Sequence, residues 1–147
     1  MAQLTEHFSD QELDVAGAEQ RLIDNAVFLC QNVLEPVREK FGVVRVNSAY
    51  RDPTHNAKVG GKTVSYHLFE DGRAVADTVA PAVPLPELFG WLRLESGLRF
   101  DKVLSESNAQ DEPACVHIQI DRLKPPRRVA YTGGTGAATN YTKQEVK

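Results

Sequence analysis

The stretch Ala114-Cys115-Val116-His117-Ile118-Gln119-Ile120-Asp121 alternates between two kinds of residue almost without a break. Successive side chains of a strand point to opposite faces, so the pattern predicts a strand over Cys115–Asp121. Its core face carries Val116, Ile118 and Ile120, and its other face carries Cys115, His117, Gln119 and Asp121. An imidazole in mid-strand, opposite the core, points into solvent or into a functional site.

The segments before this strand contain helix signals first and strand signals later. Apolar residues recur at steps of three and four from Leu22 to Phe41, with Cys30 among them, and Gly42 follows as a natural helix end. This predicts an amphipathic helix with Cys30 in the core. Further expected elements are a short helix after the capping box Ser9–Glu12, a turn or helix at Thr54–Val59, a helix from Pro84, and strands at Val43–Asn47, Arg73–Val79 and Asp101–Glu106.

Because helices precede strands without βαβ alternation, we expect an α+β fold, with N-terminal helices packed on a small antiparallel or mixed sheet. The length of 147 residues suits one domain, which we place at 1–130. Residues 131–147 lack periodicity and are expected to form a flexible C-terminal tail.

The composition excludes several classes of protein. Seventeen basic and twenty acidic residues give a net charge of −3, which argues against nucleic-acid binding. No apolar run approaches the roughly 18 residues of a membrane span, and the N-terminus is too polar for a secretory signal. Two cysteines do not make a disulfide framework. We expect a monomer that is synthesised in the cytoplasm without a signal peptide.

Three residues suggest a metal site. Asp77 ends an Ala-Val-Ala-Asp run inside an apolar strand, where a buried carboxylate must be paired or metal-bound. His67 and His117 would add two imidazoles, and two histidines with one carboxylate form the protein side of a catalytic Zn²⁺ site that leaves a position for water. Spacing alone leaves a solvated His117 open. His7 and His55, in polar surroundings, are expected to have no functional role.

The order of motifs resembles the zinc D-alanyl-D-alanine carboxypeptidase family. That family includes phage endolysins that cut the L-Ala–D-Glu bond, and it shares the hedgehog/DD-peptidase fold. The resemblance rests on Leu4–Ser9, Asn32–Arg38, Ser48-Ala49-Tyr50-Arg51-Asp52-Pro53, Asn56, Val59-Gly60-Gly61, Ser65-Tyr66-His67, the Ala-Val-Ala-Asp strand, and Val116-His117. It covers residues 4–121.

The resemblance implies that His67, Asp77 and His117 are the zinc ligands and that Arg51 faces a substrate carboxylate. Tyr50 and Ser65 would line the substrate site, and we expect them to position loops rather than to react. Glu106, at the end of the strand Asp101–Glu106, would be the general base. The loop acids Asp111 and Glu112 are the alternatives, because the position three residues before His117, where some relatives carry an acid, is Ala114.

The sequence departs from the family pattern at two places. The segment between His67 and Asp77 is longer, with the extra residues around Phe69-Glu70-Asp71, which makes Asp71 a rival ligand. Cys115 replaces the tryptophan of the family's Trp-Val-His motif, and it could act as a fourth ligand that makes the metal site structural.

The resemblance therefore implies a zinc peptidase that hydrolyses bacterial peptidoglycan stem peptides. We expect a phage or prophage lysin that reaches the wall after holin-type release or as part of a phage particle. The alternative is a non-catalytic, zinc-stabilised binding module or phage structural module of the same fold.

Overall fold

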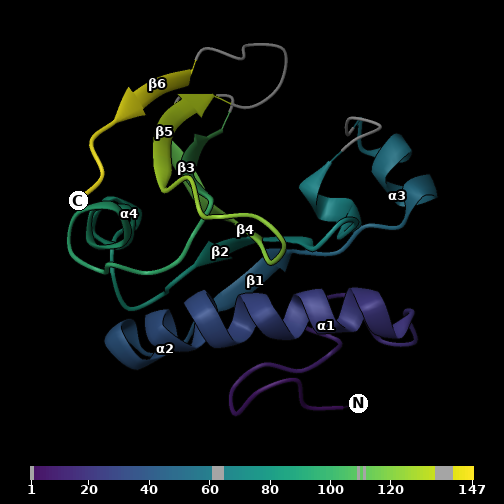
Figure 1. The fold of residues 1–147 in the computed structure, drawn as a ribbon. Coiled ribbons are helices and arrows are strands. Elements are labelled where there is room, and N and C mark those ends of the chain that lie inside the picture. Colours follow the sequence, from purple (N-terminus) through teal and green to yellow (C-terminus); the bar gives the residue numbers. More distant parts are fainter. Residues whose placement is uncertain (1, 61–64, 109, 111, 135–140) are drawn as a thin grey trace.

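A mixed sheet of six strands forms the centre of the computed structural model, which describes residues 2–60, 65–108, 110, 112–134 and 141–147. The spatial order is β1-β2-β4-β3-β5-β6 (Figure 1). β3 and β5 run parallel, and the other neighbours are antiparallel. The strand bounds are β1 Arg45–Ser48, β2 Arg73–Val79, β3 Lys102–Ser107, β4 Pro113–Asp121, β5 Val129–Gly134 and β6 Tyr141–Gln144. The α+β class with a mixed sheet is thereby confirmed.

One long helical segment packs against the sheet. It consists of α1 (Gln20–Leu29), the π-helical turn η1 (Cys30–Leu34) and α2 (Glu35–Phe41), with right-handed helical backbone angles at both junctions. It ends at Gly42, whose φ of 82° is readily accessible to glycine. Of the predicted stripe, Leu22, Cys30, Leu34 and Val37 are buried, and Ile23, Val27 and Phe41 are half-buried. The π-helical turn was not foreseen, because an apolar period of three to four residues fits both helix types.

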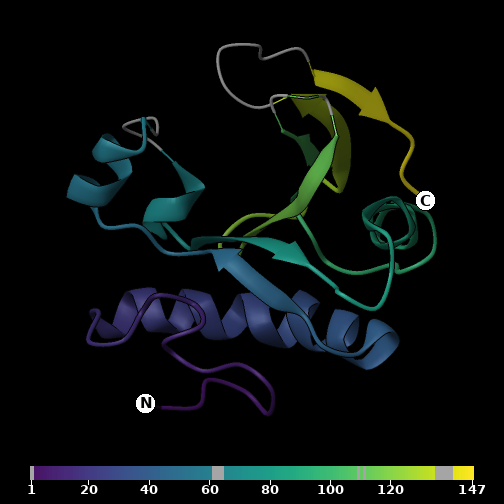
Figure 2. The same cartoon turned by 180° about the vertical axis from the view of Figure 1, so that it is seen from behind.

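The remaining helices lie at two other positions around the curved sheet. α4 (Leu85–Leu94) packs against β3 and β4, whereas α3 (Pro53–Lys58) and the 3₁₀ turn η2 (Tyr66–Leu68) lie at the opposite end of the molecule, as the two opposed views show (Figures 1 and 2). Within the described chain, no helix has the length and apolarity needed to cross a membrane.

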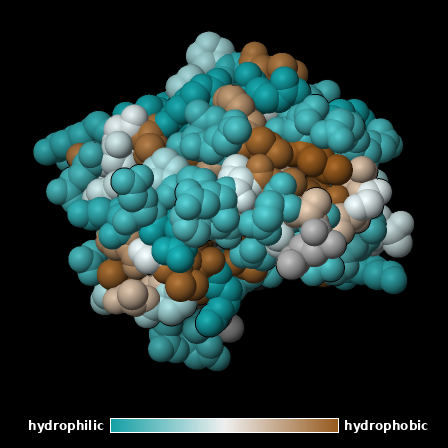
Figure 3. All heavy atoms as spheres, turned by 90° about the horizontal axis from the view of Figure 1, so that it is seen from below, coloured by the Kyte–Doolittle hydropathy of each residue, from teal (hydrophilic) through white to brown (hydrophobic). Residues whose placement is uncertain are grey.

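The helices and the sheet enclose one hydrophobic core. The residues predicted for the core face of β4, Val116, Ile118 and Ile120, are fully buried in it. Seen from the side of the N-terminal segment, the surface is mostly hydrophilic, with hydrophobic residues in separate small patches (Figure 3).

The short helix that we expected after Ser9 does not form. The capping-box hydrogen bonds form, since the Ser9 amide donates to Glu12 Oε1 and the Glu12 amide donates to Ser9 Oγ, each at 3.2 Å. The residues that follow make turns, and Asp14 has a φ of 60°. This reversal places Leu13 and Val15 in the core, so burial ends the turn before a helix can extend.

Among the described residues, the segment from residue 131, which we expected to be a flexible tail, instead forms two strands. β5 pairs with the outer edge of β3, and β6 pairs with β5. The Lys147 amide donates to the Arg93 carbonyl at 2.8 Å, which ties the last residue to α4. Backbone pairing to an available strand edge needs no apolar alternation, so the sequence pattern missed it. An independent domain at 1–130 stays a prediction.

Candidate metal centre

The structure brings His67, Asp77 and His117 together, with one potential ligand atom of each within 4.8 Å of the others. Asp77 on β2 is the direct antiparallel partner of His117 on β4, and His67 lies in η2 beside them. All three are nearly inaccessible, at 6% to 8% exposure. Their role as metal ligands stays a prediction, but the arrangement that this role requires is present.

His67 is held by its backbone and by one ring nitrogen. Ser65 caps η2, accepting a hydrogen bond from the His67 amide at 3.1 Å, and the Arg51 amide donates to the His67 carbonyl at 2.7 Å. His67 Nδ1 lies 2.6 Å from the Ala49 carbonyl oxygen. Since a carbonyl can only accept, Nδ1 carries the proton. The unprotonated Nε2 therefore faces Asp77 Oδ2, 3.5 Å away.

His117 is held through its other ring nitrogen. Its Nε2 lies 2.8 Å from Gln119 Oε1, and the Gln119 amide nitrogen lies 3.4 Å from Asp101 Oδ2. Because the carboxylate needs a donor, the Gln119 oxygen is left to accept from His117 Nε2–H. Nδ1 thus faces the site, 2.9 Å from Asp77 Oδ1.

Burial and charge set the protonation of this group. Burial lowers the pKa of His67 to about 4, against the opposing pull of Asp77. Burial alone would raise the pKa of Asp77, but its contact with His117 and the nearby His67 and Arg51 lower it overall. A neutral imidazole and an ionised carboxylate are the forms that bind a metal ion.

These residues fit Zn²⁺. Ligands about 2.0–2.2 Å from a tetrahedral ion lie roughly 3.4 Å apart, and the separations from Asp77 to the two rings, 3.5 Å and 2.9 Å, are close to that spacing. Each ring uses one nitrogen for a hydrogen bond to the protein and turns the other toward Asp77, which is the usual way in which metal-binding histidines are oriented.

Glu106 lies next to this group. It ends the site-facing row of β3, with Oε1 3.5 Å from His117 Nδ1 and a side chain that is 24% exposed. Burial, together with the charge of Asp77, raises the pKa of Glu106. A partly accessible carboxyl with a raised pKa beside candidate metal ligands has the properties of a general acid–base residue. Of the alternatives, Glu112 is exposed in the β3–β4 loop, and Asp111 lies outside the described residues.

Cys115 contacts Glu106 rather than the histidines. Its Sγ lies 3.8 Å from Glu106 Oε2, and its ligand atom groups with those of Asp77 and Glu106. Burial, with the charges of Asp77 and Glu106, raises the pKa of this thiol strongly. Cys115 is therefore a neutral neighbour of Glu106 in this structure.

The other predicted site residues surround the group in different ways. Arg51 Nη2 is 3.9 Å from Asp77 Oδ2, and its side chain is 21% exposed, so the guanidinium reaches both the site and solvent. Tyr50 packs edge-on against Phe69, with ring centroids 5.5 Å apart. Ser65 bonds the His67 amide. Tyr50 and Ser65 thus make structural contacts here, and their binding of substrate stays a prediction.

The lengthened segment leaves Asp77 in register with His117. Phe69 is fully buried with a φ of 54°, and the Asn25 amide donates to its carbonyl at 2.9 Å. Glu70 forms an ion pair with Arg21 on α1. Asp71 is exposed in the turn and joins neither group of ligand atoms found among the described residues. The extra residues are therefore accommodated by one buried ring and an outward turn.

The two histidines that were expected to have no functional role lie away from this group. His55 is exposed on α3, and His7 Nδ1 lies 2.6 Å from Glu35 Oε1 near the N-terminus. Neither belongs to the group of ligand atoms around Asp77.

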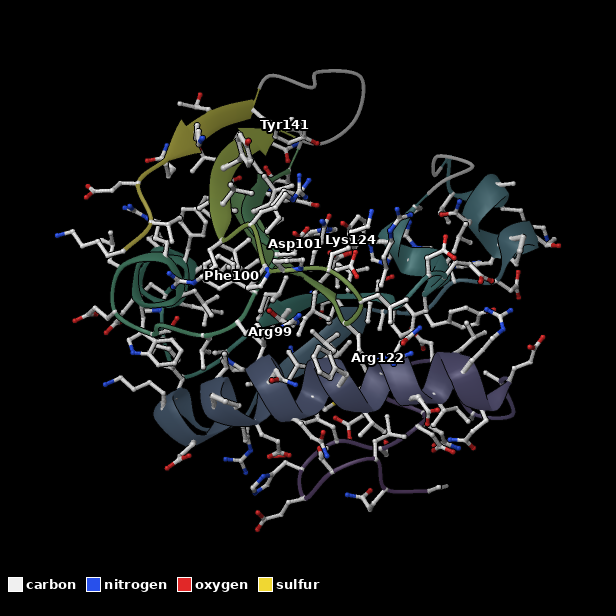
Figure 4. All side chains as sticks on the ribbon, viewed as in Figure 1. Arg99, Phe100, Asp101, Arg122, Lys124 and Tyr141 are labelled. Carbon is white, nitrogen blue, oxygen red and sulfur yellow. The ribbon has the colours of Figure 1, made fainter. Side chains whose placement is uncertain are left out.

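A polar network behind His117 was not foreseen. Asp101 (labelled in Figure 4) is 3% exposed and accepts from Gln119, from the Tyr66 hydroxyl at 3.1 Å, and from Arg127 Nε and Nη2 at 2.8 and 2.7 Å. The alternation in β4 places Gln119 on the same face as His117. This was the one sequence signal that could have indicated the network. The contact with Asp101 depends on the β3–β4 register, which the sequence does not specify.

A family model described as Peptidase M15 matches residues 4–103. The matched range contains His67, Asp77 and Arg51 and ends before Glu106 and His117, which the fold brings to the same place. A search of curated proteins found no match.

Proposed function

The chain belongs to the peptidase M15 family, and on this premise we propose that it is a zinc-dependent peptidase acting on stem peptides of bacterial peptidoglycan. The observation that carries the proposal is the meeting of His67, Asp77 and His117 beside Glu106. Three ligands on one side, with an acid–base residue next to them, form the arrangement of a hydrolytic metal site rather than of a closed structural one.

The ion would be held by His67 Nε2, an Asp77 oxygen and His117 Nδ1. Zinc bound there would supply the Lewis-acid chemistry that activates water and polarises a carbonyl. Glu106 takes the proton of the attacking water and returns it to the leaving amine, for which its raised pKa suits it. Arg51 holds a substrate carboxylate by its guanidinium, which suits bidentate pairing.

This arrangement serves either a D,D-carboxypeptidase or an L-Ala–D-Glu endopeptidase. We further propose that the protein is a phage or prophage lysin, made in the cytoplasm and acting on the wall after holin-type release or on a phage particle, and that it acts as a monomer.

A second candidate is a zinc-stabilised module of the same fold without catalysis. It is supported by Cys115, whose ligand atom lies within 4.8 Å of those of Asp77 and Glu106. In that case Glu106 would bind within an enclosed cluster with Asp77 and Cys115 and would not transfer protons.

The test is release of new amino groups from purified peptidoglycan by protein loaded with one equivalent of zinc. Glu106→Gln should lower the rate by about 10²–10⁴-fold while zinc content and melting temperature stay unchanged. Glu39→Gln, an exposed carboxylate on α2, serves as the matched control and should retain full activity, whereas loss of activity in Glu112→Gln would point to the alternative base. Zinc binding without any turnover would support the second candidate instead.

A further inference from the structure

The irregular segment that follows β1 holds His67 from two sides. The Ala49 carbonyl accepts a hydrogen bond from His67 Nδ1 at 2.6 Å, and the Arg51 amide donates to the His67 carbonyl at 2.7 Å. Ala49 is fully buried and lies just outside the strand, so strand pairing does not fix the direction of its carbonyl. The orientation of the His67 ring therefore depends on what holds this segment in place.

The turn near the N-terminus holds that segment. The Ala49 amide donates to Asp14 Oδ2 at 3.1 Å, although the two residues are 35 positions apart in sequence. The next amide, of Tyr50, donates to the Leu13 carbonyl at 3.2 Å. A chain of hydrogen bonds thus runs from the Asp14 carboxylate through the Ala49 backbone to the ring of His67.

The backbone conformation of Asp14 indicates what its side chain contributes. Its φ of 60° lies in the left-handed region, where glycine is the least strained residue and aspartate is tolerated. The reversal of the chain buries Leu13 and Val15, and glycine would serve that reversal with less strain. The aspartate adds a carboxylate that satisfies the buried Ala49 amide, and a buried amide without an acceptor is costly.

We propose that Asp14 is a positioning residue of the metal centre that does not contact the ion itself. Its carboxylate fixes the Ala49 backbone, and the Ala49 carbonyl fixes the protonated Nδ1 of His67. The unprotonated Nε2 thereby stays turned toward Asp77. This inference rests on the proposed role of His67 as a zinc ligand. Hydrogen bonds to the second ring nitrogen commonly orient metal-binding histidines, and here the N-terminal turn supports that hydrogen bond from behind.

Two substitutions at Asp14 separate its carboxylate from its backbone conformation. Asp14→Gly removes the acceptor and keeps a residue that adopts a φ of 60° without strain. Asp14→Asn keeps a side-chain oxygen that can accept from the Ala49 amide, and asparagine is also tolerated at a positive φ.

Two further substitutions are controls. Asp71→Gly is the matched control, because Asp71 has a φ of 53°, lies on an exposed turn and joins neither group of ligand atoms. Val15→Ala is the control for general destabilisation, because Val15 is fully buried beside Asp14 and its truncation leaves the carboxylate in place.

The first measurement uses the metal-free protein at neutral pH. Nitrogen NMR of isotopically labelled histidine rings shows which ring nitrogen carries the proton, and the His67 signals are assigned by their loss in His67→Ala. We expect the proton on Nδ1 in wild type, in Asp14→Asn and in both controls. In Asp14→Gly we expect a mixture of the two tautomers, because the Ala49 carbonyl is no longer held toward the ring.

The second measurement is the zinc dissociation constant of the folded protein, determined by competition with a chelator. We expect it to rise about tenfold in Asp14→Gly, at the lower end of the range for residues that support metal ligands. Asp14→Asn should restore the wild-type value, and both controls should keep it. If Asp14→Gly does not fold, Asp14→Glu replaces it, since the extra methylene displaces the carboxylate and should also weaken zinc binding.

A purely structural role of Asp14 gives a different result. It would lower the melting temperature of the metal-free protein, as Val15→Ala should, and leave the tautomer and the zinc affinity unchanged. That result overturns the proposal, as does an equal loss of affinity in Asp71→Gly or a failure of Asp14→Asn to restore binding. Wild-type protein that binds no zinc would reject the proposed function, and the tautomer in the metal-free protein would still decide whether Asp14 orients His67.

Discussion

Asp77 and His117 face each other directly across β2 and β4, with Asp77 Oδ1 2.9 Å from His117 Nδ1. This pair joins two segments that are forty residues apart in sequence. His67 completes the group from outside the sheet, so the centre depends on both a strand register and one turn of 3₁₀ helix.

Removing one imidazole should abolish metal-linked stabilisation. We expect wild-type protein to gain about 2.7 kcal/mol of unfolding free energy at zinc concentrations 100 times the dissociation constant, and His117→Ala or His67→Ala to gain almost none. Metal content by mass spectrometry and melting with and without chelator measure this. His55→Ala, which removes an exposed imidazole on α3, should behave as wild type, and equal loss in that variant would argue against the assignment.

Gln119 should control the zinc affinity of His117 without touching the ion. Gln119→Met keeps the volume but removes the oxygen that accepts from His117 Nε2, so we expect metal affinity to fall about 10–100-fold. Competition with a chromogenic chelator gives the affinity, with exposed Gln31→Met as the control. Unchanged affinity in Gln119→Met would show that the ring is oriented by other contacts.

The Asp101–Arg127 pair should make folding stability depend on acid. Burial alone would raise the pKa of Asp101, but hydrogen bonding and charge from Arg127, with the Tyr66 hydroxyl, lower it below its usual value. The contribution is therefore fully present above the unfolded pKa of about 4 and is lost as the pH falls through the lower folded value.

The variant Asp101→Asn removes this carboxylate and tests the predicted direction of the pH dependence of stability. At pH 7 we expect the variant to lose about 1–3 kcal/mol of unfolding free energy in urea. Below pH 4 the difference in unfolding free energy between the variant and wild type should narrow, because the wild-type carboxylate then becomes protonated and loses its charge. A gap that stays constant between pH 7 and pH 3 would contradict the predicted linkage.

Phe69 should anchor the lengthened segment. Its ring is fully buried against Tyr50, so Phe69→Ala should cost about 3–5 kcal/mol of unfolding free energy. Asp71→Asn, two residues later on the exposed turn, keeps a residue type that tolerates the φ of 53° and should change stability by less than about 0.5 kcal/mol. Chemical denaturation of both variants tests whether the buried residue of the segment contributes more to the unfolding free energy than the exposed one.

Much of the fold follows from local patterns in the sequence. The strand Arg73–Val79 was predicted at its observed bounds, and Gly42 ends the long helix as its position indicated. The family resemblance is confirmed by the match over residues 4–103. These features depend on apolar periodicity, on glycine at a positive φ, and on motifs that are contiguous in sequence.

The missed features depend on contacts between distant segments. β5 and β6 form because β3 offers an open edge, which no pattern after residue 131 reveals. Asp101 meets Gln119 only because the Asp101 amide donates to the Gln119 carbonyl at the start of β3. The capping box at Ser9 formed as predicted, but burial of Leu13 and Val15 decided what followed it.

The position of β4 has a consequence for how the protein is made. β4 follows β2 and β3 in sequence but lies between them in the sheet. During synthesis from the N-terminus, His67, Asp77 and Glu106 all leave the ribosome before His117. The strands that carry Asp77 and Glu106, β2 and β3, have no common neighbour until β4 inserts. The proposed ligand set of His67, Asp77 and His117 is therefore complete only once the central strand is in place. On that proposal, metal loading follows closure of the sheet, and shorter chains released before β4 lack the proposed centre.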